Sequence, residues 1–428
     1  MADPALALQT FDDVACTACG CVCDDLRLTV AGGRITRAEG ACALAEPWLL
    51  SQESCQPPAA EIDGRACSLE DALQAAAKIL STARAPLIYG LSRSSTPGQR
   101  AAARLADRLG ATIDTTASMC HAPSIMAVQE VGESTCTLGE ISNRADLVVY
   151  WGSDPLTSHP RHMERYSTDR AGMFRPGGRA DRTLVVADIR RSPTAEVADH
   201  YLPVEPGHDF EVLWALRALV ADKPLRLGAV RGAPLAELLS LAEKMKSCKC
   251  GVVFFGLGLT QGPLGHRNVE ALLLLVKELN AHTRFHARRM RVHGDVAGAD
   301  TVLCWQTGFP FSVNLARGYP RYNPGEYSAN DVLAAREADA CLLVGSEGVA
   351  ALSPAAIEQI EQIPTIALDY PTVESFPRPT VRITTAVYGV HLPGTAYRMD
   401  EVPIPLRAVL PPKYASDEEV LRQIMKRI

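Results

Sequence analysis

Cys16-Thr-Ala-Cys-Gly-Cys-Val-Cys-Asp-Asp25 is the stretch that most restricts the fold of this chain. It spaces Cys16, Cys19 and Cys23 as C-x2-C-x3-C, and a fourth cysteine, Cys42, follows within Gly40-Ala-Cys-Ala43. Three thiolates in one tight loop can hold three corners of a 4Fe–4S cluster while the fourth returns from the next hairpin, because soft sulfur ligands suit iron. The spacing therefore predicts an iron–sulfur lobe at the N-terminus.

Zinc is the alternative metal for these thiols. Zinc sites with four cysteines usually consist of two C-x2-C pairs that lie far apart in the sequence. Here the second pair is missing and Cys21 is an extra thiol inside the loop, so the pattern favours the cluster. Disulfides are the third alternative. Met1-Ala-Asp-Pro-Ala5 has no basic segment and indicates no signal peptide, so we expect a cytoplasmic location and reduced thiols.

Composition limits the remaining possibilities. The chain has 428 residues, of which 47% are hydrophobic, and a formal net charge of −6. This length is enough for two or three lobes with cores of their own, and the charge gives no basic excess that would attract nucleic acid. The longest apolar run, 271–276, falls far short of the ~20 residues that a membrane-spanning helix needs. We expect neither a nucleic-acid nor a membrane partner.

Short β-branched runs alternate with helical stretches, as in α/β folds. The runs predicted to be buried parallel strands are 87–90, 147–152, 184–188, 252–256, 302–305, 341–345 and 365–369. Most of them end on Gly, Ser or Asp, and ligands in open α/β sheets bind at the carboxyl ends of strands. Residues 68–80 are predicted to be helical, because Ser68 and Asp71 form a capping-box pattern ahead of an apolar stripe.

Ser118-Met-Cys-His-Ala-Pro-Ser124 is a second cysteine motif, separate from the cluster. Cys120 beside His121 suits a metal ligand or an activated nucleophile, and a buried packing cysteine is the alternative. The neighbours His121 and Pro123 favour a metal ligand. A thiol enzyme would also need an acid to orient the histidine, for which Asp114 is the nearest candidate.

Taken together, these and other stretches resemble the B subunit of formylmethanofuran dehydrogenase over nearly the whole chain. Such subunits are similar to molybdopterin oxidoreductases, in which a cluster lobe precedes interleaved α/β domains that enclose two pterin dinucleotides. The matching stretches are 16–25, 120–124, 134–139, 143–146, 148–153, 159–162, 254–258, 306–308, 318–326 and 394–400.

The resemblance implies a multi-lobed α/β fold of the molybdopterin-oxidoreductase type, with an N-terminal iron–sulfur lobe and doubly wound parallel sheets. We expect the cysteine-rich lobe at 1–60 and a discontinuous α/β domain formed by 61–135 and 330–400. A nested Rossmann-like domain is expected at 136–329 and a C-terminal tail at 401–428.

The resemblance also implies the roles of individual residues. Cys16, Cys19, Cys23 and Cys42 would hold the cluster, and Cys120 would be the protein ligand of molybdenum or tungsten. His121 would relay a proton, and Arg291 would steady a carboxylate. The residues expected to contact a bis-pterin dinucleotide cofactor lie at or near the strand ends: Gly152, Ser153, Asp154, His159, Asp188, Gly256, Gly258, Thr307, Gly308, Gly345, Ser346 and Asp369. For His159 the alternative is a hydrogen bond within its own loop.

Three places depart from the family pattern, and all bear on the pterin. Val292 stands where the family has Gly, Gly345-Ser-Glu-Gly348 replaces Ser-Asp-Pro, and bulky groups follow Asp369 in 370–376. Side chains of this size can fill space that a cofactor needs. These departures therefore favour the interpretation that the pterin site is idle or lost.

Bacterial methylotrophs have homologues of these subunits in a formyltransferase/hydrolase complex, which needs no redox step. We predict that this chain is the framework B subunit of such a complex, with an idle or lost pterin site. Homologues of the A (amidohydrolase-like), C and D (formyltransferase) subunits would be its partners and would act on a furan-type one-carbon carrier. The alternative is a working molybdenum- or tungsten-pterin subunit that interconverts carbon dioxide and a formate-level carbon.

Overall fold

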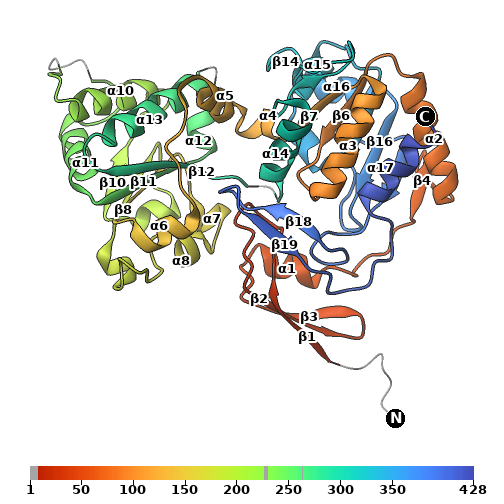
Figure 1. Cartoon of the computed structure of the whole chain (residues 1–428), viewed down its shortest axis with the longest axis horizontal. Helices are drawn as coiled ribbons and strands as arrows, with labels where there is room; N and C mark the ends of the chain where they lie inside the picture. Colours follow the sequence, from red (N-terminus) through yellow and green to blue (C-terminus); the bar gives the residue numbers. More distant parts are fainter. Residues whose placement is uncertain (1–7, 226–229, 263, 293) are drawn as a thin grey trace. The chain divides into compact units, whose positions relative to one another are not determined.

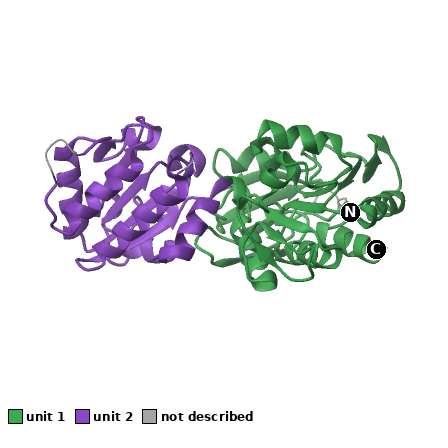
Figure 2. Ribbon diagram, turned by 90° about the horizontal axis from the view of Figure 1, so that it is seen from above, with its two compact units in different colours: residues 1–119, 293–428 green, residues 120–292 purple. Residues whose placement is uncertain are grey.

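Two compact units make up the chain, and the computed structural model describes residues 8–225, 230–262, 264–292 and 294–428 of it. Unit 1 comprises 1–119 and 293–428, and unit 2 comprises 120–292 (Figure 2). The nested unit therefore differs from the expected span of 136–329. The physical reason is that α14 (Val296–Thr307) packs on α3 (Thr96–Leu109), which places the segment after 293 in unit 1.

A nine-stranded mixed sheet forms the centre of unit 1. Its middle strands β7, β6, β15, β16 and β17 are parallel, and the pairs at both edges are antiparallel. The predicted strands at 87–90, 341–345 and 365–369 are confirmed within it. In spatial order the strands are β14 (Arg321–Tyr322), β13 (Val313–Asn314), β7 (Thr112–Thr115), β6 (Pro86–Gly90), β15 (Ala340–Val344), β16 (Thr365–Asp369), β17 (Val381–Thr384), β4 (Ala60–Ile62) and β5 (Arg65–Ala66).

Both faces of this sheet are buried. Successive side chains of a strand point to opposite sides, so neighbouring residues enter different cores. Ile88 and Leu342 join the core under α2 (Leu69–Thr82), α3 and α17 (Asp417–Met425). Leu87 and Leu343 join the core under α15 (Ala329–Ala334) and α16 (Pro354–Gln362) on the other side (Figure 1). The predicted doubly wound arrangement is confirmed for unit 1.

Unit 1 also carries the N-terminal lobe. The strands β1 (Gln9–Val14), β2 (Leu26–Ala31) and β3 (Arg34–Glu39) form an antiparallel sheet, and α1 (Ala45–Leu50) follows. Part of the expected C-terminal tail is a strand, since β19 (Pro403–Leu406) pairs with β18 (Gly394–Tyr397). The Met399 N–H donates to the Gly20 carbonyl at 2.8 Å, so the segment between β18 and β19 holds the cysteine loop against the rest of unit 1.

Unit 2 is built on a five-stranded sheet in which every pair is parallel. The helices α10 (Asp209–Val220), α11 (Leu235–Ser247) and α13 (Gly265–Leu279) pack on one face. On the other face, Tyr150 and Phe254 contact His162 of α8 (His162–Tyr166). The strand order is β10 (His200–Pro203), β9 (Thr183–Asp188), β8 (Leu147–Trp151), β11 (Cys250–Phe255) and β12 (Arg284–Arg289).

One predicted strand is wrong and one predicted helix is confirmed. Residues 302–305 belong to helix α14, in which Val302 and Leu303 are buried and Trp305 is exposed. A short apolar run does not distinguish a strand from a helix segment by periodicity alone. Helix α2 begins after Ser68, whose side chain accepts the Asp71 N–H as the capping-box pattern requires.

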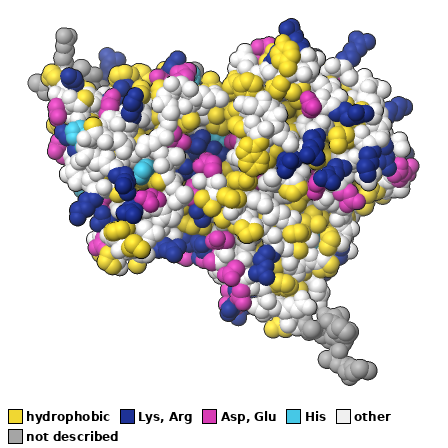
Figure 3. Space-filling model, in the orientation of Figure 1, with side chains coloured by type: hydrophobic (Ala, Val, Ile, Leu, Met, Phe, Trp, Pro, Cys, Tyr) yellow, Lys and Arg dark blue, Asp and Glu magenta, His cyan; other side chains and the backbone are white. Residues whose placement is uncertain are grey.

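The surface carries charges of both signs. Figure 3 shows acidic and basic side chains interspersed on the visible face of each unit, in keeping with the small net charge of −6. Within the described ranges, no helix is long and apolar enough to cross a membrane.

Candidate functional site

The four N-terminal cysteines come together in unit 1. Cys16, Cys19 and Cys23 lie in the loop between β1 and β2, which a bond from the Cys16 N–H to the Cys23 carbonyl closes at 2.8 Å. Cys42 lies just before α1, and its carbonyl accepts the N–H groups of Ala45 and Glu46. Burial raises the pKa of the Cys16 thiol, and the charges of the other three thiolates raise it further. The four sulfurs are therefore close enough to interact electrostatically.

Four thiols in one lobe are a donor set that can hold a 4Fe–4S cluster or a zinc ion. In the part of the chain that the structure describes, no group of three or more Cys, His, Asp or Glu side chains converges as a metal ion would require. A tetrahedral zinc site needs four sulfurs around one point, whereas each thiolate of a cubane binds a different iron.

Cys21, which the spacing leaves without a ligand role, is buried among the other thiols of the loop. Only 1% of its surface is exposed. Hydrogen bonds with the Cys19 and Cys23 thiols raise the pKa of Cys21, and the hydrogen bond with Cys21 lowers the pKa of Cys19. Cys21 thus lies close to two of the expected ligands.

A pocket of about 240 Å³ lies at the carboxyl ends of β8 and β11 in unit 2. It brings together Gly152, Ser153, Asp154, His159 and Gly256, all expected at the cofactor. A Cβ at position 256 would lie 2.7 Å from the Gly152 carbonyl oxygen, and Gly152 itself has φ +54°. Only glycine permits this close approach of the two strand ends. The remaining lining residues are Thr157, Ser158, Arg190, Leu257, Met290 and Val292.

Gly258 and Asp188 lie beside this pocket and support its walls. The Gly258 N–H donates to the Gly152 carbonyl at 3.1 Å. Asp188 ends β9, and its pKa is raised. Burial is the largest cause, and the charge of nearby Asp154 adds to it, whereas backbone hydrogen bonds lower the pKa in part. Val292, expected to fill cofactor space, lines the pocket without closing it.

His159 uses both ring nitrogens within the protein. Nε2 lies 2.7 Å from the Arg291 carbonyl and Nδ1 lies 2.8 Å from the Ser158 hydroxyl. Because a carbonyl only accepts, Nε2 carries the hydrogen and Nδ1 accepts from Ser158. Burial lowers the pKa of His159 to about 4, so the ring is neutral at pH 7. The loop hydrogen bond named as the alternative for His159 is present, and it fixes the backbone at Arg291.

The expected catalytic residues Cys120, His121 and Arg291 all belong to unit 2. Cys120 ends α4 (Ala117–Cys120), and α5 (Ala122–Val131) begins directly after His121. The Thr260 hydroxyl of α12 (Leu257–Thr260) donates to the Cys120 carbonyl at 3.3 Å. His121 and Arg291 are buried, whereas Cys120 is partly exposed. Thr260 could not be identified from the sequence, because a single threonine in a four-residue helix forms no recognisable motif.

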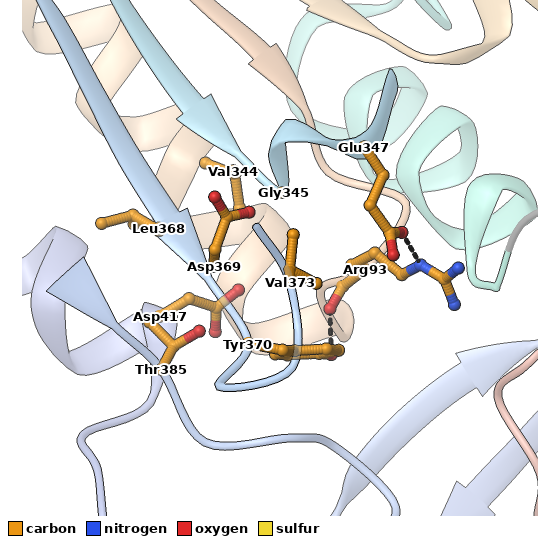
Figure 4. A pocket seen from close by; sticks show the side chains of 10 residues that line it. All are labelled: Arg93, Val344, Gly345, Glu347, Leu368, Asp369, Tyr370, Val373, Thr385 and Asp417. Carbon is orange, nitrogen blue, oxygen red and sulfur yellow. Dashed lines mark hydrogen bonds and ion pairs between the residues drawn. The ribbon is translucent and has the colours of Figure 1, made fainter. Parts of the chain in front are cut away.

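In unit 1, the space between the ends of β15 and β16 is small. Gly345 and Asp369 line a pocket of only about 10 Å³, which is room for about one water. Asp369 accepts the N–H and the hydroxyl of Ser346, each at 2.8 Å. Arg93 pairs with Glu347 across the opening, and the Tyr370 hydroxyl donates to the Arg93 carbonyl (Figure 4). The sequence did not identify Arg93, which follows a strand as an ordinary polar residue.

Thr307 and Gly308 lie at the end of α14 in unit 1, where helix termination accounts for both. The Thr307 hydroxyl donates to the Leu303 carbonyl at 2.8 Å, and its oxygen accepts the Phe309 N–H. Gly308 has φ +86° and caps the helix. Their expected contact with a cofactor stays a prediction.

Comparison with solved structures defines the class. The chain aligns with the formyltransferase/hydrolase complex FhcABCD from Methylorubrum extorquens, solved with methylofuran, at a TM-score of 0.71 and 25% identity over 86% of this chain and 98% of that one. Acetylene hydratase from Pelobacter acetylenicus aligns at a TM-score of 0.69 and 12% identity over 97% of this chain and 69% of that one. The chain therefore has the molybdopterin-oxidoreductase-like fold that the sequence predicted.

Sequence comparison narrows this class to a family. The chain is 40% identical to the B subunit of the tungsten-containing formylmethanofuran dehydrogenase 2 of Methanocaldococcus jannaschii, over 98% of this chain and 99% of that protein. It belongs to the family of formylmethanofuran dehydrogenase B subunits. The B subunit of the Methylorubrum extorquens formyltransferase/hydrolase complex is 27% identical over 67% of this chain and 75% of that protein. No protein-family model matches the sequence.

Proposed function

We propose that this chain is a working tungsten- or molybdenum-pterin subunit of a formylmethanofuran dehydrogenase complex, which is the alternative that the sequence left open. The observation that carries the proposal is 40% identity, over nearly its whole length, to a subunit named as tungsten-containing. The match to the corresponding subunit of the methylotroph complex is weaker and shorter, at 27% over 67% of the chain. The retained cysteines of the N-terminal loop and Cys120 support the same conclusion.

The residues divide the work between the two units. In unit 1, Cys16, Cys19, Cys23 and Cys42 would hold the 4Fe–4S cluster, and in unit 2 Cys120 would hold the metal. When bound, the metal-pterin centre supplies two-electron exchange with a formate-level carbon, and the cluster supplies one-electron transfer. The Arg291 guanidinium would bind the carboxylate, and an imidazole nitrogen of His121 would take or return the proton.

His159 would keep Arg291 in place for this role. Its neutral ring donates from Nε2 to the Arg291 carbonyl, and Ser158 fixes the tautomer from the other side. The pair Met290 and Val292 on either side of Arg291 lines the pocket. The backbone that carries the guanidinium is therefore anchored beside the space where a cofactor would bind.

One pterin dinucleotide would lie along the strand ends of unit 2. The glycines Gly152 and Gly256 let a ligand approach the backbone closely at β8 and β11. A second pocket of about 700 Å³ lies at the ends of the next strands, β9 and β10, where Ile189, Pro203 and Val204 supply apolar surface. Asp188 stands between the two pockets, where an acidic side chain suits a ribose hydroxyl.

The partner proteins and the carrier are proposed by transfer from the relatives. The solved neighbour is a complex of four kinds of subunit with methylofuran. We propose homologues of the A, C and D subunits as partners and a furan-type one-carbon carrier, with the formate joined to or released from that carrier elsewhere in the complex.

The framework role is the second candidate, and a specific observation favours it. Between the ends of β15 and β16 in unit 1 lies a pocket of only about 10 Å³, and Glu347 and Tyr370, both in segments that depart from the family pattern, line it. A bis-pterin cofactor would need space there as well as in unit 2. The idle or lost pterin site thus stays a prediction.

Metal analysis of the anaerobically purified complex tests the two candidates. A working subunit contains about four irons and about one tungsten or molybdenum per copy of this chain. The Cys120→Ser variant is expected to lose the tungsten or molybdenum and keep the iron, and the Cys19→Ser variant to lose iron. Absence of both pterin metals from the wild type, together with formate release from a formylated carrier, would establish the framework role instead.

A further inference from the structure

An ion pair lies where two neighbouring strands of unit 1 end. Arg93 follows β6 and Glu347 follows β15, and these strands are adjacent and parallel. Their side chains are 21% and 37% exposed, so both are partly withdrawn from water. The Tyr370 hydroxyl holds the Arg93 carbonyl from below in the view of Figure 4. Arg93 is thus held at its carbonyl by Tyr370 and at its guanidinium by Glu347.

The cysteine loop lies directly beside the segment that carries Arg93. Gly294 separates the two, since a Cβ there would be 2.7 Å from the Ser92 carbonyl oxygen and 3.2 Å from that of Thr17. The Asp295 N–H donates to the same Ser92 carbonyl at 2.9 Å. Ser92 precedes Arg93, and Thr17 follows Cys16. Two loops from distant parts of the sequence therefore meet through one glycine.

Arg93 directly follows Ser92, whose carbonyl oxygen meets the same glycine as that of Thr17, so Arg93 belongs to the surroundings of the cysteine loop. A cluster that gains an electron becomes more negative by one charge. A fixed cation stabilises that form, and it does so more strongly where protein rather than water lies between the charges.

We propose that Arg93 raises the reduction potential of the cluster held by Cys16, Cys19, Cys23 and Cys42, and that Glu347 limits this effect through its ion pair with Arg93. The proposal rests on the cluster of the proposed function. It assigns the pair an electrostatic role in addition to closing the pocket of unit 1.

Variants of the two partners separate an electrostatic from a structural role. Arg93→Gln is expected to shift the midpoint potential of the cluster to more negative values, measured by a redox titration followed by electron paramagnetic resonance on the complex. Glu347→Gln leaves the cation uncompensated and is expected to shift the potential to more positive values. Arg93→Lys keeps the charge and should stay close to the wild type.

The control is Arg336→Gln, which breaks an exposed ion pair with Glu358 on α16 of the same unit. In Figure 1, α16 lies at the end of unit 1 opposite the strands β1–β3, so this variant should leave the potential unchanged. Shifts of the same sign in Arg93→Gln and Glu347→Gln, or no shift in either, would overturn the proposal while the proposed function stands. Should Arg93→Gln fail to assemble, the sign of the shift in Glu347→Gln decides. A wild-type complex without iron would overturn both the proposed function and this inference.

Discussion

The strand ends of the two units present opposite surfaces. In unit 2, Gly152 and Gly256 border a pocket of about 240 Å³. In unit 1, Arg93, Glu347 and Tyr370 line a cavity of only about 10 Å³ at the ends of β15 and β16. Both sheets are parallel at these ends and place loops there for the same topological reason. The size of these two cavities is therefore decided by a few side chains after the strands rather than by the fold.

The contrast shows that the departures from the family pattern have unequal consequences. Val292 borders the pocket of unit 2, which stays open. Glu347 and Tyr370, in contrast, fall in unit 1, and each contributes to an internal bond that closes its pocket. Changes that look alike in the sequence thus separate into one tolerated at an open site and two that build a closed one.

Gly256→Ala is expected to have the largest effect, because it attacks the open site. The added Cβ lies 2.7 Å from the backbone oxygen of Gly152, so the strand ends must move apart. We expect at least a tenfold loss of bound tungsten or molybdenum with iron retained, measured as metal content of the purified complex. Gly139→Ala in the same unit is the matched control, since its Cβ would meet an ordinary contact at 3.6 Å. Equal metal content in both variants would show that the open pocket is not the pterin site.

His159→Phe tests whether the open site depends on a fixed Arg291. The variant leaves the Arg291 carbonyl without its donor, which costs about 1–3 kcal/mol when the group stays buried. Misplacement of the guanidinium is expected to lower kcat by about tenfold to a hundredfold. His159→Gln can still donate from its side-chain amide and should recover part of the loss. Equal activity of His159→Phe and wild type would show that the hydrogen bond from His159 to the Arg291 carbonyl does not position Arg291 for the reaction.

The sequence predicted the open site better than the closed one. Gly152 and Gly256 were identifiable because each ends a β-branched run, the four N-terminal cysteines because their spacing is local, and Cys120 because His121 and Pro123 lie beside it. Arg93 and Asp417, which lie far apart in the sequence, meet only through tertiary packing at the pocket of unit 1. Likewise, residues 302–305 had the composition of a strand, and packing between α3 and the sheet made them a helix.

His159 also makes the stability of unit 2 sensitive to acid. Burial lowers the pKa of His159 to about 4 from its ordinary value of 6.5. Below pH 6.5 the unfolded chain therefore binds a proton that the folded chain refuses, and stability is lost as the pH falls toward 4. His159→Gln is expected to remove part of this loss, on the order of 3 kcal/mol at most. Denaturant unfolding at pH 7 and pH 4.5 measures it, and an unchanged pH dependence would contradict the assignment.

The smallest expected effect compares a tyrosine from each unit. Tyr370 in unit 1 and Tyr201 in unit 2 each donate a hydroxyl to a backbone carbonyl beside a strand end. The Asp188 carbonyl that Tyr201 reaches also accepts the Val204 N–H at 3.0 Å, so it keeps a donor in Tyr201→Phe. Tyr370→Phe removes a bond that closes the pocket of unit 1 and should lower the free energy of unfolding by about 1 kcal/mol, more than Tyr201→Phe. Neither variant should change the metal content. A loss of tungsten or molybdenum in Tyr370→Phe alone would mean that the closed end of unit 1 also takes part in holding the cofactor, and the contrast between the two units would then be one of degree.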